Sequence, residues 1–422
     1  MPELITSPRG TQDVLPEYSY RWQYIERALQ EVCRRFGYKE VRVPTFEHTE
    51  LFARGVGDTT DVVGKEMYTM TDKGGRSITL RPEGTSGVAR AFMQSGILSG
   101  TLPVRAFYIM SCFRYEKPQA GRLREFHQLG IELYGSSEPD ADCEVIRVAS
   151  SALSGFGLKK VRLEINSIGC PDCRPIYRKA LYDYFSLRRS ELCETCRDRL
   201  ERNPMRIIDC KSPTCQSVAS GAPIALDYLC EDCSGHFEKL KALLDETNIA
   251  YTVNPRIVRG LDYYTKTVFE FVHEGAGAQG TVCGGGRYDG LVGELGGQPT
   301  PGVGFGMGME RLLGVLDSEG IEAPRPCGPE LFIAYLGALG EKKSREFVNR
   351  LQDMGIFAMR DINARSLKAQ LKFADKQHAK FLAVIGDDEV AKGIVTVKNM
   401  AGGGSFECGL DAAQLAAAIG KN

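Results

Sequence analysis

Apolar positions recur along this chain with two different periods, which predict helices in some stretches and strands in others. Near the start, a spacing of three and four predicts an amphipathic helix over residues 18–36 that stops at Gly37. Its apolar positions are Trp22, Ile25, Leu29, Val32 and Phe36.

Shorter elements follow this helix. YKEVRVPTF (38–46) predicts a strand ended by its proline, HTELFARG (48–55) a helical turn, and SITLR (77–81) another strand. The next residues open a helix, and we expect Thr85 or Ser86 to be its N-cap.

Two longer strands are predicted at 104–116 and 124–135, joined by the loop KPQAGRL. The second alternates cleanly with period two, so its residues divide between two faces. One face carries Leu129, Ile131 and Leu133, and the other Phe126, Gln128, Gly130 and Glu132. The first set predicts a core face, and the second the floor of a polar pocket.

The later part of the chain changes character twice. Residues 170–250 combine clustered cysteines with helical patterns and read as an insertion. TVFEFV (267–272) predicts a strand preceded by RGLDYYT, and both tyrosines of that stretch can line one pocket only if the strand bends or bulges. After the Pro-rich linker EAPRPCGPE, alternating strand and helix patterns predict a small α/β domain. We expect domains at 1–325 and 326–422.

Composition narrows the function classes. Lys+Arg 53 against Asp+Glu 54 leaves the 422-residue chain nearly neutral, so nucleic-acid contacts must come from local basic patches. No apolar run approaches the ~18 residues that span a bilayer, and the start lacks the apolar core of a signal peptide. We therefore expect a soluble cytoplasmic protein with no membrane segment, in which the 14 cysteines are thiols or metal ligands.

The sequence has no complete P-loop, and its one match to the dinucleotide-binding motif is not followed by the helix that this motif requires. GAGAQG (275–280) matches G-x-G-x-x-G, but TVCGGGRYDG after it cannot be the helix that receives a pyrophosphate. VGKE (63–66) lacks the leading glycine and the hydroxyl of a P-loop. A nucleotide would have to be held by other groups, and arginines are suited to phosphate oxygens.

Arginines stand inside four recognisable stretches. VRVPTF (41–46), FRYEKPQAGRLREFHQ (113–128) and GVGFGMGMER (302–311) resemble the three motifs of class II aminoacyl-tRNA synthetases. RGLDYYT (259–265) resembles the signature of histidyl-tRNA synthetases, as do RPEGT (81–85) and RGTQDVLP near the start. The resemblance covers essentially the whole chain.

The resemblance implies an α+β catalytic domain built on an antiparallel sheet with a helical insertion, plus a C-terminal α/β anticodon-binding domain. It implies ligation of L-histidine to tRNA(His) through a histidyl-adenylate, with ATP and Mg²⁺, in a homodimer. Arg114 and Arg259 would be the catalytic residues and would hold the α-phosphate, and Arg311 would hold the γ-phosphate. Phe126 would stack on one face of the adenine ring, and Arg311 would cover the other face of the adenine. The implied ATP-binding residues are Arg114, Glu116, Phe126, Arg259 and Arg311, and the implied histidine-binding residues are Glu83, Gly84, Thr85, Gln128, Glu132, Tyr263 and Tyr264.

Basic side chains could contact tRNA at two places. Lys117, Arg122 and Arg124 are available to the acceptor strand, and Lys368, Lys372 and Lys376 form a stripe on a predicted helix. The alternative for the stripe is a solvated charged face.

The insertion carries cysteines at metal-ligand spacing: Cys170 and Cys173, Cys193 and Cys196, Cys230 and Cys233, and the wider pair Cys210 and Cys215. Such pairs in a cytoplasmic protein are typical of tetrahedral Zn²⁺, as one or two structural ions. The alternative is that small, easily buried residues fill the insertion.

Two other functions compete with the synthetase. A regulatory subunit of ATP phosphoribosyltransferase shares this fold, but such paralogues generally lack the C-terminal domain and depart from the catalytic signature. A zinc-organised nucleic-acid-binding module without activity fits poorly with the near-zero net charge.

Overall fold

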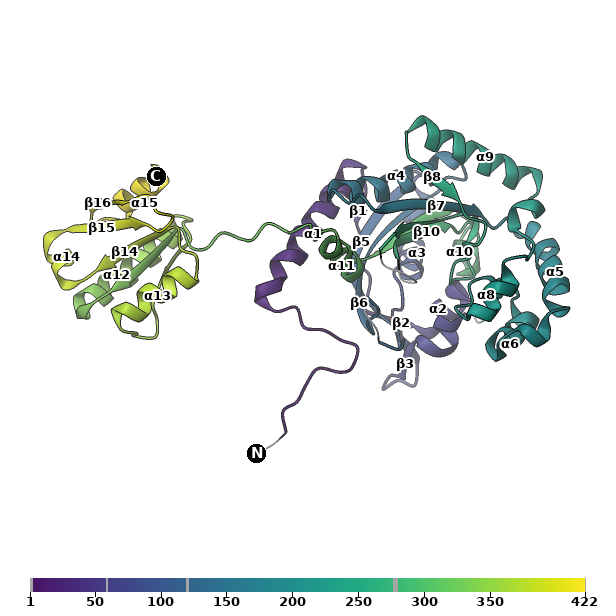
Figure 1. Ribbon diagram of the computed structural model, residues 1–422, viewed down its shortest axis with the longest axis horizontal. Helices are drawn as coiled ribbons and strands as arrows, with labels where there is room; N and C mark the ends of the chain where they lie inside the picture. The colour runs from purple at the N-terminus through teal and green to yellow at the C-terminus, as the bar shows by residue number, and fades with distance from the viewer. Residues whose placement is uncertain (1–2, 58–59, 119–120, 276–279, 422) are drawn as a thin grey trace. The chain divides into compact units, whose positions relative to one another are not determined.

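A computed structural model describes residues 3–57, 60–118, 121–275 and 280–421 of the chain. These residues form two compact units, Met1–Ala323 and Pro324–Asn422 (Figure 1). None of the helices in the described ranges combines the length and apolar character needed to cross a bilayer.

The first unit is built on an eight-stranded sheet with the order β1-β5-β6-β11-β10-β9-β7-β8. The neighbours pair antiparallel except at the two edges, where β1 pairs with β5 and β7 with β8 in parallel. The strands in sheet order are β1 Lys39–Glu40, β5 Val104–Phe113, β6 Glu125–Tyr134, β11 Gly302–Gly308, β10 Thr281–Arg287, β9 Thr265–His273, β7 Val161–Ser167 and β8 Tyr251–Val253.

The two faces of this sheet have different partners, as the alternation in residues 124–135 predicts. Leu129, Ile131 and Leu133 lie in an apolar core with residues of four helices. These helices are α1 Pro16–Arg35, α4 Pro139–Gly155, α9 Glu231–Glu246 and α11 Met309–Ser318. The opposite face carries Tyr108 and Tyr264 and packs against α3 Thr85–Gln94 and α10 Leu291–Glu294.

Smaller elements complete the first unit. A three-stranded sheet with the order β2-β4-β3 precedes α3 along the chain. Its strands and the neighbouring helices are β2 Phe46–His48, β3 Tyr68–Thr71, β4 Ser77–Leu80, α2 Thr49–Val56, the π-turn Val62–Glu66 and the 3₁₀ turn Ile97–Ser99. The insertion contains α5 Cys173–Ser186, α6 Glu194–Arg202, α7 Met205–Ile208 and α8 Pro213–Ala219, with 3₁₀ turns at Arg189–Glu191 and Ala225–Tyr228.

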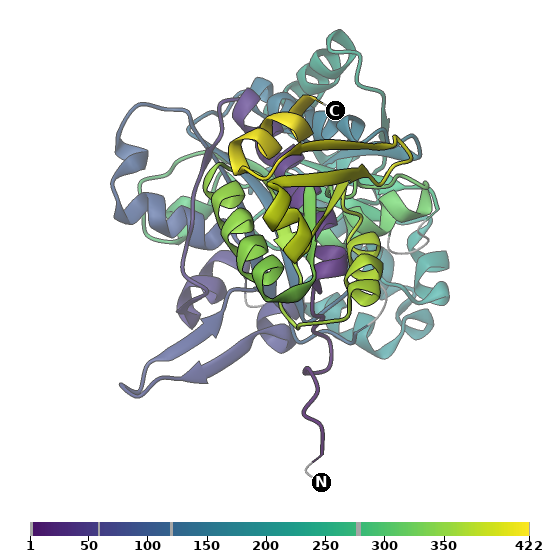
Figure 2. The same ribbon diagram turned by 90° about the vertical axis from the view of Figure 1, so that its left-hand side faces the viewer.

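The second unit is the predicted α/β domain. Its sheet has the order β13-β12-β14-β15-β16, in which the first three strands are parallel and the last two antiparallel. Two helices, α12 and α15, pack on one face, and α13 packs on the other (Figure 2). The elements are β12 Leu331–Tyr335, α12 Gly337–Asp353, β13 Ala358–Arg360, α13 Leu367–Lys376, β14 Phe381–Ile385, α14 Asp387–Lys392, β15 Ile394–Asn399, β16 Ser405–Gly409 and α15 Ala412–Lys421.

Two local predictions were wrong for identifiable reasons. The strand predicted over 38–46 is interrupted. Within it only β1 and Phe46, the first residue of β2, are in strands, because the carbonyls of Val43 and Pro44 accept hydrogen bonds from Arg81 Nη1 (2.8 and 3.1 Å) instead of from a strand partner. The N-cap of α3 is Gly84 rather than Thr85 or Ser86.

Two other stretches lie partly outside the described residues. They are the interior of GAGAQG, residues 276–279, and residues 119–120 of the loop KPQAGRL.

Candidate active site

A cavity of about 430 Å³ opens on the sheet face opposite α4 and α9. It gathers most of the expected site residues, although they come from distant parts of the sequence. Those that line it are Glu83, Thr85, Arg114, Glu116, Phe126, Gln128, Arg259, Tyr263, Tyr264 and Arg311. Glu132 and Gly84 do not line it, but both adjoin residues that do.

Glu132 is a buried carboxylate on β6 that accepts three hydroxyl hydrogen bonds. The donors are Thr85 Oγ1 at 2.8 Å, the Tyr108 hydroxyl at 3.1 Å and the Tyr288 hydroxyl. Burial raises the pKa of Glu132 to about 8, and the hydroxyl donors only partly oppose that shift. A buried carboxyl group with a raised pKa therefore lies directly behind the residues that line the cavity.

A second carboxylate, Glu83, stands at the N-terminus of α3. It accepts the backbone N–H groups of Thr85 (3.2 Å) and Ser86 (2.8 Å), and so occupies the positive end of the helix dipole. It also accepts the Tyr263 hydroxyl at 3.2 Å. The stretch RPEGT thus places a negative charge, held by several donors, on the cavity wall.

The two tyrosines of RGLDYYT both line the cavity, and they do so from the turn that precedes β9 rather than from the strand itself. Lys266 has a φ of 49°, in the left-handed region, and the β9–β10 register shifts beside Arg287. The two rings lie 4.7 Å apart between centroids. Tyr263 and Tyr264 both precede β9, so the alternation of a regular strand does not send them to opposite sides.

Glycines on β10 and β11 make room for this site. A Cβ at Gly304 would overlap the backbone carbonyl of Ile131 and the carboxylate of Glu132, and would approach the Tyr288 hydroxyl to 2.9 Å. A Cβ at Gly284 would lie 2.6 Å from Arg259 Nη1. The glycines of β10 and β11 therefore leave space for functional groups on neighbouring strands and loops.

Arg259 lies against Gly284 and forms an ion pair with Glu270 of β9. Its guanidinium carbon is 5.7 Å from the ring centroid of Tyr264. Burial lowers the pKa of Arg259, but Glu270 and Tyr264 raise it by more, so it lies above its usual value. The side chain is a fixed cation at the cavity wall.

Arg114 and Arg311 approach the same cavity from other elements. Arg114 follows β5, donates from Nε to the Pro82 carbonyl (2.8 Å) and lies 5.4 Å from the ring centroid of Phe126. Arg311, in the first turn of α11, donates from Nη1 to the Thr281 carbonyl (2.7 Å). Burial, together with the positive charges of neighbouring arginines, lowers the pKa of Arg311. Three guanidinium groups therefore converge on one space.

The remaining basic residues are placed as follows. Arg122 Nη1 donates to Glu116 Oε2 (3.1 Å) at the cavity wall, whereas Arg124 lies over the Tyr115 ring, 3.9 Å from its centroid. Lys117 is exposed in the loop after β5. In the second unit, the three lysines of the predicted stripe are exposed on α13; they are Lys368, Lys372 and Lys376.

Sequence reasoning missed several residues of the site. Tyr108 and Tyr288 bond to Glu132, and Glu270 pairs with Arg259. Alternation places Tyr108 on one face of its strand, but only its pairing with Gly130 of β6 shows that this is the pocket face. No local pattern marks the other two as site residues, because their partners lie on other strands.

The eight cysteines of the insertion gather into two groups of four. The first group is Cys170, Cys173, Cys230 and Cys233, and the second is Cys193, Cys196, Cys210 and Cys215. Within each group all the sulfurs lie within 4.8 Å of one another.

Comparisons with known proteins match this architecture. A sequence model described as Histidyl-tRNA synthetase matches residues 10–172 and 219–312, and one described as Anticodon binding domain matches residues 330–421. A protein named Histidine--tRNA ligase from Caldanaerobacter subterraneus subsp. tengcongensis is 53% identical over 408 residues, 97% of this chain and 98% of its own. One of the same name from Acetivibrio thermocellus is 52% identical over 408 residues, with the same coverage.

A solved structure agrees with these sequence matches. The apo histidyl-tRNA synthetase of S. aureus superposes with a TM-score of 0.83 at 40% identity, covering 98% of this chain and 99% of that one. The class II fold expected from the motifs is confirmed by this match and by the two sheets. The chain belongs to the histidyl-tRNA synthetase family.

Proposed function

We propose that this protein joins L-histidine to tRNA(His) in two steps, with ATP as the energy source and histidyl-adenylate as the intermediate. The observation that carries the proposal is the convergence of Arg114, Arg259 and Arg311 on one cavity, beside the carboxylates of Glu83 and Glu132. Full-length relatives named Histidine--tRNA ligase support the same reaction.

The first step brings two anions together, because the histidine carboxylate attacks the α-phosphorus of ATP and pyrophosphate leaves. Fixed cations lower this barrier more than proton transfer can. Arg114 and Arg259 would hold the α-phosphate and Arg311 the γ-phosphate. The Phe126 ring, on the cavity wall, offers a flat surface for adenine.

Histidine would be held at the other end of the cavity. The Glu83 carboxylate suits the α-ammonium group, with Thr85 and Gln128 beside it on the cavity wall. The imidazole would meet Tyr264 and the buried Glu132. A pocket that hydrogen-bonds a substrate nitrogen rejects analogues that lack it far better than an apolar pocket can.

The residues present fit a Mg²⁺ ion that arrives with ATP. In the described ranges, the groups of three or more ligating side chains are the two cysteine groups, so the chain has no carboxylate cage of its own there. The cavity offers Glu116 and Glu270, each already paired with an arginine. This donor set suits an ion held mainly by phosphate oxygens and water, where it would neutralise phosphate charge.

The second step transfers the histidyl group to the 3′ end of tRNA. Lys117, Arg122 and Arg124 would serve the acceptor strand, and the second unit, with its exposed lysines on α13, would bind the anticodon. We further propose that the enzyme acts as a homodimer in the cytoplasm.

Pyrophosphate exchange with each of the twenty amino acids tests the proposal. We expect exchange with histidine and background rates with the other nineteen. A well-folded protein that is silent with histidine would favour the regulatory subunit instead. That alternative is disfavoured here, because the anticodon-domain match and the arginines of the catalytic signature are both present.

A further inference from the structure

The two cysteine groups of the insertion have the geometry of metal sites, although they take no part in the proposed chemistry. In the first group, the Cys170 and Cys173 sulfurs are 3.7 Å apart, and those of Cys170 and Cys230 are 3.9 Å apart. In the second, the Cys193 and Cys210 sulfurs are 3.9 Å apart. A tetrahedral ion with Zn–S bonds of about 2.3 Å places its sulfurs about 3.8 Å from one another.

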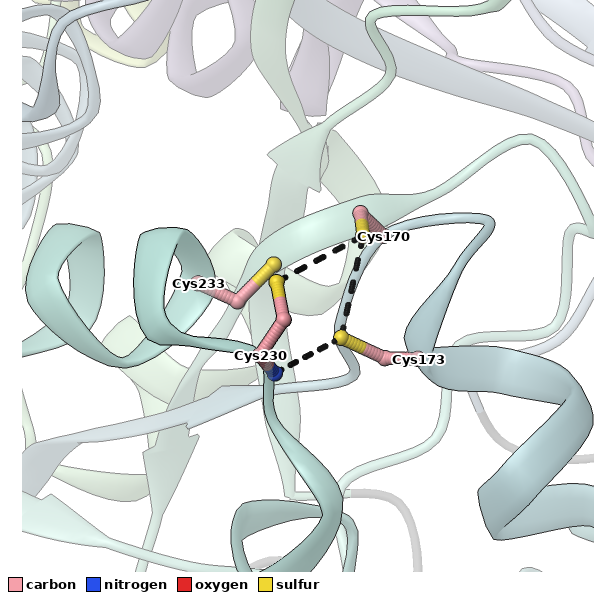
Figure 3. Close-up of side chains that lie close together, drawn as sticks. All are labelled: Cys170, Cys173, Cys230 and Cys233. Atoms are coloured by element: carbon pink, nitrogen blue, oxygen red, sulfur yellow. Dashed lines mark hydrogen bonds between the residues drawn. The ribbon is translucent and has the colours of Figure 1, made fainter.

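The cysteines of each group converge on one another, and those of the second group do so inside an apolar cluster that includes Leu200 and Ile207. In Figure 3 the side chains of the first group point inward from two helix starts that are distant in sequence. Cys170 and Cys230 are separated by 60 positions. Thiols that merely filled a core would have no reason to meet four at a time, twice, and all eight are free of disulfides.

Backbone donors also point at sulfur, as they do around metal-bound thiolates. The N–H of Cys230 lies 3.1 Å from Cys173 Sγ, and the N–H of Cys193 lies 3.2 Å from Cys215 Sγ. Such donors stabilise sulfur that carries negative charge. Both groups therefore have an outer layer of hydrogen bonds in place.

We propose that the insertion binds two structural Zn²⁺ ions, each by four cysteine thiolates. Four soft sulfur ligands in a closed tetrahedron favour Zn²⁺ and leave no position for a substrate. The first ion joins the start of the insertion to its end, because Cys173 begins α5 and Cys233 lies in the first turn of α9. The second closes the segment that contains α6, α7 and the start of α8.

The second site supports the loop that carries Arg259. Between its cysteines, Arg206 Nη1 donates to the Arg259 carbonyl (3.2 Å), and Asn203 Nδ2 donates to Asp262 Oδ1 (3.4 Å). Asp209 and Lys211, which flank Cys210, line the catalytic cavity. The second ion therefore positions one wall of the cavity without touching the reactants.

The family match sharpens the distinction between the two sites. The matched ranges stop at residue 172 and resume at 219, so all four cysteines of the second group lie outside them, whereas three of the first group, all but Cys173, lie inside. Zinc there would be a property of this insertion rather than of the shared catalytic fold. Loss of the second ion would change activity by displacing the loop that carries Arg259.

Metal analysis of the full-length protein, purified without chelator, tests the proposal directly. We expect about two equivalents of zinc per chain. The double variant C173S/C233S and the double variant C196S/C215S should each lose one equivalent, whereas C327S, at an exposed cysteine outside both groups, should keep both. Less than about half an equivalent in the wild type would overturn the proposal.

A second measurement covers variants that fail to fold. Stripped wild-type protein refilled with Co²⁺ should show the intense thiolate-to-metal absorption of tetrahedral sulfur sites, saturating at two equivalents. Saturation at one would overturn one site, and iron as the metal found after purification would overturn zinc. These readouts do not depend on amino-acid activation, so they stand or fall separately from the proposed function.

Activity then separates the two sites. If C196S/C215S folds, its histidine-dependent exchange should fall at least about tenfold through disorder of the Arg259 loop, and its KM for histidine should rise. Unchanged kinetics in a folded variant that has lost one zinc would overturn the supporting role of the second site.

Discussion

Replacing Arg259 should slow adenylate formation for two separable reasons. The first is the loss of a cation from the transition state, which costs about 10²–10³ in rate for one donor. The second is the Glu270 carboxylate, which the R259A substitution would leave unpaired beside the incoming phosphates. Arg259 and Glu270 are each 20% exposed, so this charge is only partly screened by water.

The second contribution can be bounded. A carboxylate about 6 Å from a phosphate charge repels it by roughly 3 kcal/mol at an effective dielectric constant of 20. Solvent screening reduces this to about 1–2 kcal/mol, or roughly tenfold in rate. We therefore expect R259A to lose about 10³–10⁴, and the double variant R259A/E270Q to recover about tenfold of that loss.

The assay is histidine-dependent pyrophosphate exchange at saturating ATP and histidine, with thermal unfolding recorded for each variant. The matched control is R76A, because Arg76 is an exposed arginine that also pairs with an acidic residue but lies in a surface turn. It should exchange at the wild-type rate. If R259A stays within tenfold of wild type, or if R259A/E270Q is slower than R259A, the electrostatic reasoning is refuted.

Three further outcomes follow from the buried groups. The pKa of Glu132 is about 8 in the folded state against a reference value of 4.5, so between pH 4.5 and 8 the folded state keeps a proton that the unfolded state releases. The free energy of unfolding should therefore fall as pH rises from 4.5 to 8, by up to about 1.4 kcal/mol per pH unit. Urea titrations should show that E132Q removes this pH-dependent loss of stability. Arg287 and Asp142 form a fully buried ion pair, so R287M, which leaves the Asp142 charge unpaired, should destabilise the first unit by about 3–5 kcal/mol in denaturant titrations. The double variant R287M/D142N should lose less stability, and equal losses in the two variants would contradict an unpaired charge as the cause. In calorimetry, G304A should weaken histidine binding at least about tenfold and leave ATP binding unchanged. The control G314A, whose added Cβ would meet open space, should bind histidine as tightly as the wild type. Equal losses of histidine affinity in the two variants would exclude a steric origin.

Short-range patterns predicted much of the architecture because they depend on neighbours along the chain. The alternation over residues 124–135 separated the core face of β6 from its polar face, and the spacing of three and four over 18–36 marked α1. The motifs RGLDYYT, FRYEKPQAGRLREFHQ and GVGFGMGMER named Arg259, Arg114 and Arg311, which the cavity gathers. The predicted N-cap of α3 failed because the carboxylate of Glu83 already satisfies its first N–H groups.

The sequence alone determined the family, the order of elements and the presence of cysteine pairs at metal-ligand spacing. Only the tertiary structure decided which pairs share a site: Cys170 and Cys173 meet Cys230 and Cys233, although Cys193 is nearer along the chain. It also decided that Tyr108 and Tyr288 bond to Glu132 and that Glu270 pairs with Arg259. The reason is physical, because cross-strand register and helix packing bring these groups together, and neither leaves a local period in the sequence.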